Sequence, residues 1–129
     1  MMWEMYNPNP KGRNTIDCTV RVLTKAMDIG WDEAYALIAA EGYRLKSMPV
    51  NNAVWGAILK KKGFAREGIP NTCPDCYTAE QFAQDHPKGI YVLGFDGHVA
   101  TVRDGILYDS WDSSHEIPQY YWMKGAGNV

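Results

Sequence analysis

Long apolar runs and an excess of one charge are both absent from this 129-residue sequence. No segment approaches the ~20 consecutive apolar residues that a membrane-spanning helix needs, and the opening stretch MMWEMYNPNPKGRN lacks the basic and apolar regions of a signal peptide. The 13 basic and 15 acidic residues give a net charge of -2, which argues against a dedicated nucleic-acid binder. The one basic cluster, residues 60–62, fits the end of a helix, where cations favour the last carbonyl groups. We therefore expect a cytoplasmic protein that binds neither membranes nor nucleic acids.

Cysteine is scarce, with three residues in the chain. An odd number without a secretion signal is typical of reduced thiols in a cytosol. Cys73 and Cys76 form one C-x-x-C, and no second such pair completes a structural zinc site. His86 and His98 could supply the missing ligands. Such a site would, however, use His98, which the predicted hairpin over residues 96–114 orients beside an acid. We interpret this C-x-x-C as part of a loop and expect no metal or cofactor. A thiol redox protein is the alternative for this pair.

Length and composition predict one compact domain over residues 1–129, beginning with an irregular arm over residues 1–13 that is rich in Pro, Asn and Gly. Apolar spacing and capping residues predict helices within 14–30, 31–42 and 51–63, the second ending at Gly42. Thr78 and Gln81 have the spacing of a capping box for a short fourth helix. From Gly89 the period changes to that of strands, over 89–97, 98–105 and 106–112, and residues 117–125 either add an edge strand or pack over the sheet. Helices followed by an antiparallel sheet indicate an α+β fold.

The hairpin DGHVATVRDGILYDSWDSS, residues 96–114, has a register that follows from its turn. Asp104-Gly105 between two apolar runs favours a two-residue type I′ turn. In that register His98 lies opposite Trp111, and Ala100 lies opposite Asp109. A three-residue loop would exchange the two faces of the strand.

His98 and Asp109 then become diagonal neighbours on one face, at a separation of roughly 7–8 Å between Cα atoms, so that the carboxylate reaches the imidazole. Asp112 falls on the opposite face and is the less favoured partner. A histidine at the start of a strand is often a surface or core residue with no further role. A paired acid on the same face instead favours an oriented base.

Cys18 is the candidate nucleophile, because it lies in the first turn of the first predicted helix, directly after Asp17. Unpaired backbone N–H groups and the helix dipole favour a thiolate there, and the same N–H groups can receive an oxyanion. A buried structural cysteine is the alternative interpretation.

The motifs NTIDCTVRVLTKA and GHVATVRDGILYDSWDS resemble those of the papain-like cysteine peptidase superfamily, and most of all small phage and bacterial proteins of peptidase C39-like type. In these, DC opens a helix and GHV precedes a DxWD strand. The resemblance covers about residues 14–112 and includes the chain order Cys18, His98, Asp109. It implies a papain-like fold, with N-terminal helices packed on a C-terminal antiparallel sheet.

The resemblance also implies a cysteine hydrolase that cleaves a peptide, isopeptide or related amide bond through a Cys-His-Asp triad, without a cofactor. Relatives commonly place a Gln about six residues before the Cys to bind the oxyanion, where this chain has Gly12. Asn14 is the nearest substitute, and it is also a possible helix cap. Trp111 would shield the His98–Asp109 contact from water, or else be a core residue. The expected partner is a protein or peptide substrate, such as a host protein. A catalytically weak or inactive papain-like fold that serves as a phage or bacterial protein-binding module is the alternative.

Overall fold

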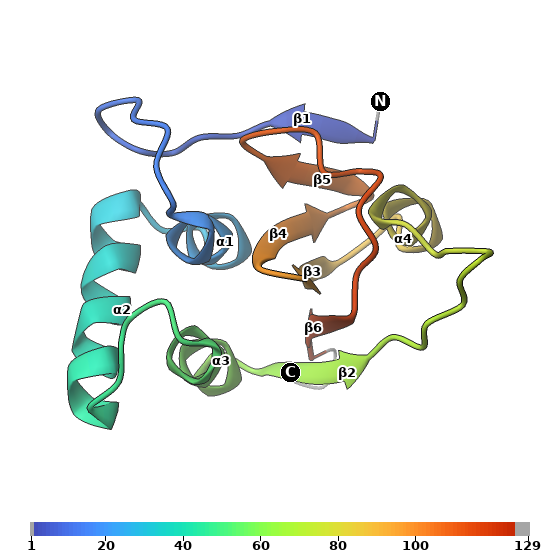
Figure 1. Cartoon of the computed structure of the whole chain (residues 1–129). Helices are drawn as coiled ribbons and strands as arrows, with labels where there is room; N and C mark the ends of the chain where they lie inside the picture. Colours follow the sequence, from blue (N-terminus) through green and yellow to red (C-terminus); the bar gives the residue numbers. More distant parts are fainter. Residues whose placement is uncertain (1, 126–129) are drawn as a thin grey trace.

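Helices occupy the first half of the chain and most strands the second half in the computed structural model, which describes residues 2–125 (Figure 1). The helices are α1 (Cys18–Met27), α2 (Trp31–Leu45), α3 (Asn52–Lys61) and α4 (Ala79–Asp85). The strands are β1 (Trp3–Met5), β2 (Phe64–Gly68), β3 (Ile90–Phe95), β4 (His98–Arg103), β5 (Ile106–Asp109) and β6 (Tyr120–Lys124). The described chain therefore has an α+β fold. No helix in this part of the chain is both long and apolar enough to cross a membrane.

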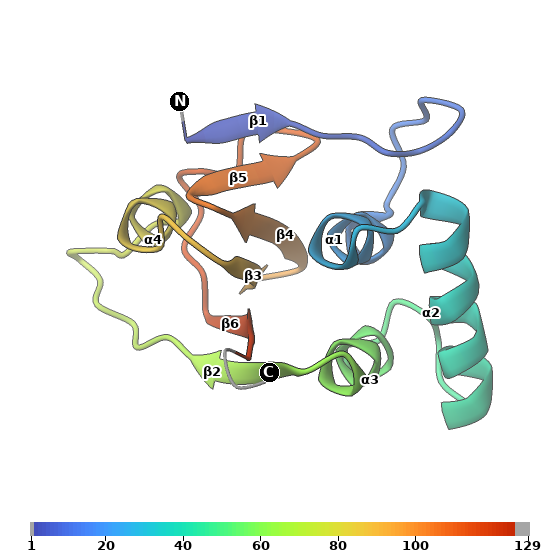
Figure 2. The ribbon, with the colours of Figure 1, turned by 180° about the vertical axis from the view of Figure 1, so that it is seen from behind.

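The six strands form one mixed sheet in the order β1-β5-β4-β3-β6-β2. Helices α1, α2 and α3 lie on one side of it and α4 lies on the other, as Figures 1 and 2 show from opposite directions. Successive strand residues point to opposite faces, so β3 contributes to two cores. Val92 packs with α1, α2 and α3, whereas Leu93 packs with Phe82 of α4.

The predicted hairpin register is confirmed. Asp104 and Gly105 have φ values of 50° and 80°, the positive angles that a type I′ turn requires. Arg103 pairs with Ile106, and Val102 pairs with Leu107. This register carries His98 at the start of β4 toward Asp109 at the end of β5.

The predicted capping box is also confirmed. The Thr78 hydroxyl accepts from the backbone N–H of Gln81, and the Gln81 side chain accepts from the backbone N–H of Thr78. The second helix, however, continues past Gly42 and ends at Leu45, where Lys46 takes the left-handed conformation that stops it. The predicted stop at Gly42 was wrong because a glycine inside a helix costs only about 1 kcal/mol.

The sheet differs from the prediction at its two edges. The chain start is not irregular throughout, because β1 pairs in parallel with β5, with Trp3 opposite Leu107, and makes the sheet mixed rather than antiparallel. At the other edge, residues 64–68 form β2, which the sequence did not indicate. The segment 117–125 contributes β6 as an internal strand between β3 and β2, and not as an edge strand or a cover.

Candidate active site

Cys18, His98 and Asp109 come from three elements and meet at one end of the sheet. Cys18 begins α1, His98 begins β4 and Asp109 ends β5. Cys18 and His98 both line a pocket of about 200 Å³, which Phe95 and Tyr120 also line. Fold and chain order thus bring together the three side chains that the sequence singled out.

Asp109 is the best-anchored member of this group. Its side chain is 0% exposed. One carboxylate oxygen, Oδ2, accepts from His98 Nε2 at 2.7 Å and from Ser113 Oγ at 2.6 Å. The other, Oδ1, accepts from the Ser110 backbone N–H at 2.8 Å and from Arg21 Nη2 at 3.3 Å. The predicted contact between His98 and Asp109 is therefore confirmed, and Asp112, which instead accepts from the Ser114 N–H at 3.1 Å, is not the partner.

The imidazole of His98 is held by its ring faces as well as by Asp109. Phe95 stacks on it with ring centroids 5.9 Å apart, and Trp111 lies 5.0 Å away at a tilt of 37°. Burial alone would lower the pKa of His98, but hydrogen bonding with Asp109 and Cys18 outweighs burial and raises the pKa to about 9. Because Asp109 occupies Nε2, the other ring nitrogen, Nδ1, is the one available to Cys18.

The pKa of the Cys18 thiol shifts in the opposite direction. Burial would raise it, but hydrogen bonding with His98 and the backbone of Val99, together with the positive charges of His98 and Arg21, lowers the pKa below its ordinary value. A lowered thiol pKa beside a raised imidazole pKa favours a thiolate–imidazolium pair near neutral pH. That pair is the ordinary form of an activated cysteine nucleophile.

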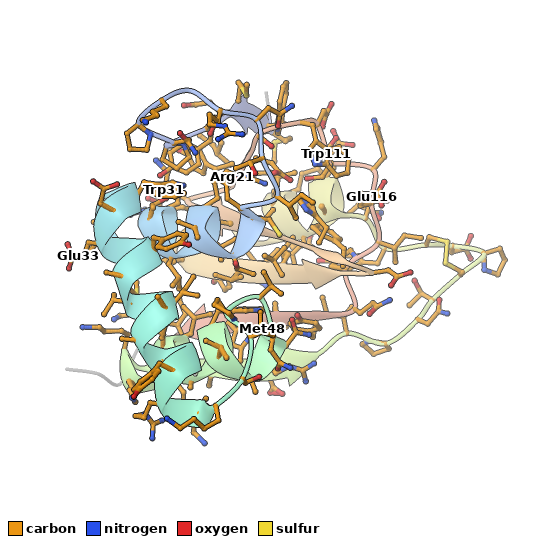
Figure 3. All side chains as sticks on the ribbon, turned by 60° about the vertical axis from the view of Figure 1, so that its left-hand side comes forward. Arg21, Trp31, Glu33, Met48, Trp111 and Glu116 are labelled. Carbon is orange, nitrogen blue, oxygen red and sulfur yellow. A yellow bond between two sulfur atoms is a disulfide. The ribbon has the colours of Figure 1, made fainter. Side chains whose placement is uncertain are left out.

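Arg21 is a buried residue of the site that the sequence interpretation missed. Its guanidinium joins Asp17, the residue before Cys18, to Asp109 at the end of β5. Asp17 also accepts a 2.9 Å bond from the indole N–H of Trp31, so its carboxylate does not cap α1 with its side chain. Figure 3 shows Arg21 and Trp31 on the side of the molecule where α1 and α2 begin. The i, i+4 spacing of Asp17 and Arg21 was a visible signal, but the third partner lies 88 residues away from Arg21.

Tyr120 is the second residue that sequence reasoning did not single out. Its side chain is 8% exposed, and its ring lies against Gly94, where an added Cβ would come within 2.0 Å of the tyrosine Cζ. Arg66 covers the ring at 4.0 Å from its centroid. Burial raises the pKa of Tyr120, and a charge on Cys18 adds to this effect. Tyr120 lines the pocket that contains Cys18, and among residues 2–125 its hydroxyl has no hydrogen-bond partner.

Two predicted supporting residues differ in their placement. Asn14 is exposed and does not line the Cys18 pocket, so it is not positioned beside the nucleophile. The chain between residues 14 and 17 precedes the helix and carries this side chain outward. Trp111 is 46% exposed, which contradicts a core role, but its ring does lie beside His98 as the register predicts.

The two cysteines of the C-x-x-C do not line the Cys18 pocket. Cys73 and Cys76 are joined in a disulfide, so the expectation of three reduced thiols is wrong for this pair, and Cys18 is the free cysteine. Two cysteines separated by two residues in a turn have their Cα atoms 4.1 Å apart, close enough to be bridged. Among the residues described, no cluster of three or more His, Cys, Asp or Glu side chains is arranged to hold a metal ion.

Comparisons with protein-family models, curated proteins and solved structures find no match to this chain.

Proposed function

We propose that the protein is a cysteine hydrolase that cleaves a peptide, isopeptide or related amide bond through Cys18, His98 and Asp109. The observation that carries the proposal is the continuous arrangement of thiol, imidazole and buried carboxylate, with the His98 pKa raised to about 9 and the Cys18 pKa lowered. The same order of residues and elements supports membership of the papain-like superfamily, with peptidase C39-like proteins as the most similar group.

The chemistry follows from the charges of the pair. The Cys18 thiolate attacks the carbonyl carbon, and the C=O π electrons move onto the oxygen. As the tetrahedral intermediate collapses, the C–N bond breaks and the His98 imidazolium gives its proton to the leaving amine. His98, now neutral, takes a proton from water, which attacks the thioester and releases the acid with the thiolate restored. Asp109 keeps the imidazole oriented and stabilises its charged form throughout.

The negative oxygen of the intermediate needs hydrogen-bond donors, and Asn14 does not face the pocket. Backbone N–H groups at the start of α1 are one source, since the first N–H groups of a helix have no partner within it. The hydroxyl of Tyr120 is the other, because this residue lines the same pocket and its hydroxyl is otherwise unpartnered in residues 2–125. We assign these two groups to the oxyanion site.

A protein-binding module with weak or lost catalysis is the second candidate. The exposed position of Asn14 and the glycine at position 12 favour it, because neither provides the upstream amide donor that the resemblance implies. In this case the thiol would remain paired with His98, but no acyl group would be transferred to it.

Alkylation of Cys18 tests the activated thiol. Cys18 is expected to react with iodoacetamide at pH 6 at least about tenfold faster than N-acetylcysteine, because a lowered pKa supplies more thiolate. His98→Ala should abolish this advantage, whereas His115→Ala, which removes an exposed histidine, should keep it. Alkylation of the parent protein no faster than N-acetylcysteine would contradict the proposal.

Acyl transfer separates the two candidate functions. A hydrolase should release p-nitrophenol from p-nitrophenyl acetate in a burst of about one equivalent per chain as Cys18 is acylated, followed by slower turnover. Cys18→Ser should remove the burst. An activated thiol that gives no burst would identify the binding module instead.

A further inference from the structure

A larger pocket, of about 690 Å³, adjoins the Cys18 pocket. It lies between the segment before α1, the exposed side of α2 and the loop that follows α2. Ile16, Thr19 and Val50 line both pockets, so the two spaces share a wall. Figure 3 views this side of the molecule, with Trp31 at the start of α2 and Met48 in the loop after it. A molecule bound in the larger pocket would therefore lie next to the pocket that contains the nucleophile.

The walls of this pocket are apolar and open to solvent. Ile16 is 92% exposed, Met48 is 70% exposed and Val50 is 63% exposed. Trp31 and Tyr35 form one side, with their rings stacked at 5.1 Å. Scattered exposed apolar residues are ordinary, but a continuous group around a concave space is typical of a binding site.

The charged residues at the pocket favour an occupant of one charge over the other. Lys11 and Arg13 border it, on a chain whose net charge is -2. Asp17 also borders it, but its carboxylate is already bonded to Arg21 and Trp31. An exposed Asp32 leaves one positive charge in excess. An occupant with an acidic group beside its apolar part is therefore favoured over a basic one.

We infer that this pocket binds an extended segment of the polypeptide substrate, placing a bulky apolar side chain within one or two residues of the carbonyl that Cys18 attacks. The inference rests on the proposed function, because it uses Cys18 as the point of attack. An extended chain advances about 3.3 Å per residue, so adjoining pockets accept neighbouring residues of one strand. Because the two pockets share part of their lining, an apolar side chain in the larger pocket would place a neighbouring carbonyl near the Cys18 thiol.

Pentapeptides with a central dehydroalanine test the inference without requiring turnover. The Cys18 thiolate adds to the β-carbon, the α-carbon takes a proton from His98, and no group leaves. Each of the four flanking positions is varied among Gly, Phe, Glu and Lys, and adduct formation is followed by intact-protein mass spectrometry. At one position Phe should accelerate adduct formation by about 10- to 100-fold over Gly, the range expected for burying one large apolar side chain. Glu at a neighbouring position should react faster than Lys.

Two variants on α2 locate the preference. Ala39 is exposed and lines the pocket, so Ala39→Trp should fill it and remove the Phe preference. Ala40 is also exposed but does not line it, so Ala40→Trp is the matched control and should keep the preference. Circular dichroism verifies that both variants fold, and Ala40→Trp should react with iodoacetamide at the parent rate.

The outcomes distinguish the two proposals. No positional preference for Phe, or a preference that Ala39→Trp leaves intact, would overturn the inference while Cys18 remained an activated thiol. A pocket that instead holds a second copy of this chain would show the same absence of preference, together with a dimer in sedimentation that Ala39→Trp breaks. Failure of the parent protein to react rapidly with iodoacetamide would overturn the proposed function itself.

Discussion

The pKa of His98 is the property of the site that depends most directly on Asp109, and Asp109→Asn is the change that tests this dependence. The substitution keeps the shape of the side chain and removes its negative charge. Burial would then act on the imidazole without an opposing carboxylate, and burial favours the neutral form. We expect the pKa of His98 to fall from about 9 toward its ordinary value of 6.5.

The size of the effect follows from these two values. The difference between about 9 and 6.5 corresponds to about 3 kcal/mol at roughly 1.4 kcal/mol per pKa unit. Water reaches part of the ring and screens the interaction, and Cys18 supplies a share, so the contribution of Asp109 is about 1 to 2 kcal/mol. Because the pKa is raised in the folded protein, this stabilisation is fully present below pH 6.5 and is lost as the pH rises through about 9.

Nuclear magnetic resonance of protein labelled with ¹³C at the histidine Cε1 measures the pKa directly. The chain has three histidines, so His98→Gln assigns the signal of interest. Asp112→Asn is the matched control, because it removes a nearby exposed carboxylate that bonds to Ser114 and not to His98. Titration from pH 5 to pH 10 should give the control the same His98 midpoint as the parent protein. The midpoint for Asp109→Asn should be lower.

A His98 signal that still titrates near pH 9 in Asp109→Asn would refute the reasoning, since some other group would then hold the proton. Should the asparagine variant fail to fold, Ser113→Ala provides a milder change. It removes the 2.6 Å bond that Ser113 donates to the same carboxylate oxygen as His98. Asp109 would then interact more strongly with the imidazole, and the pKa of His98 should rise or stay, never fall.

Three further changes test the surroundings of the site. Arg21→Met leaves the carboxylates of Asp17 and Asp109 without their shared cation. It should lower the free energy of unfolding, measured with urea, by about 3 to 5 kcal/mol. A loss below about 1 kcal/mol would mean that the bridge is as weak as an exposed ion pair. Tyr120→Phe should slow acylation by p-nitrophenyl acetate by about 100-fold, yet leave iodoacetamide alkylation unchanged because alkylation forms no oxyanion; equal slowing of both reactions would contradict the assigned role. Gly94→Ala places a Cβ within 2.0 Å of the Tyr120 ring. It should therefore lower the free energy of unfolding by about 1 to 3 kcal/mol and also slow acylation. An acylation rate equal to that of the parent would show that the position of the ring is unimportant.

Features that depend on neighbouring residues could be predicted from the sequence. The Asp104-Gly105 turn was predictable because few residues accept positive φ at two successive positions. The turn then determined the strand register and, through it, the contact between His98 and Asp109. The capping box of α4 was predictable for a similar reason, since both of its hydrogen bonds lie within four residues.

Features that depend on distant residues were not predictable. Strand β1 has three residues and weak periodicity, and it exists because the backbone of β5 offers it a partner about a hundred residues later. Strand β2 has four exposed residues among its five, so its burial pattern resembles a loop, and pairing with β6 alone makes it a strand. Arg21 looked like a polar position on a helix because its second carboxylate, Asp109, is on another element.

The same distant contacts explain why the acid of the site is so firmly placed. The backbone carbonyl of Asp109 accepts from Tyr6 N–H at 2.8 Å, which extends the pairing of β1 with β5 to the residue that holds His98. Its side chain is held independently by Ser113 and Arg21. Asp109 is thus held by the chain start, by α1 and by its own loop, and α1 is the helix that carries Cys18. Arg21 connects that helix to the acid, so the positions of Cys18 and Asp109 depend on each other through a contact that does not involve His98. His98 therefore lies between two partners that are held in place together.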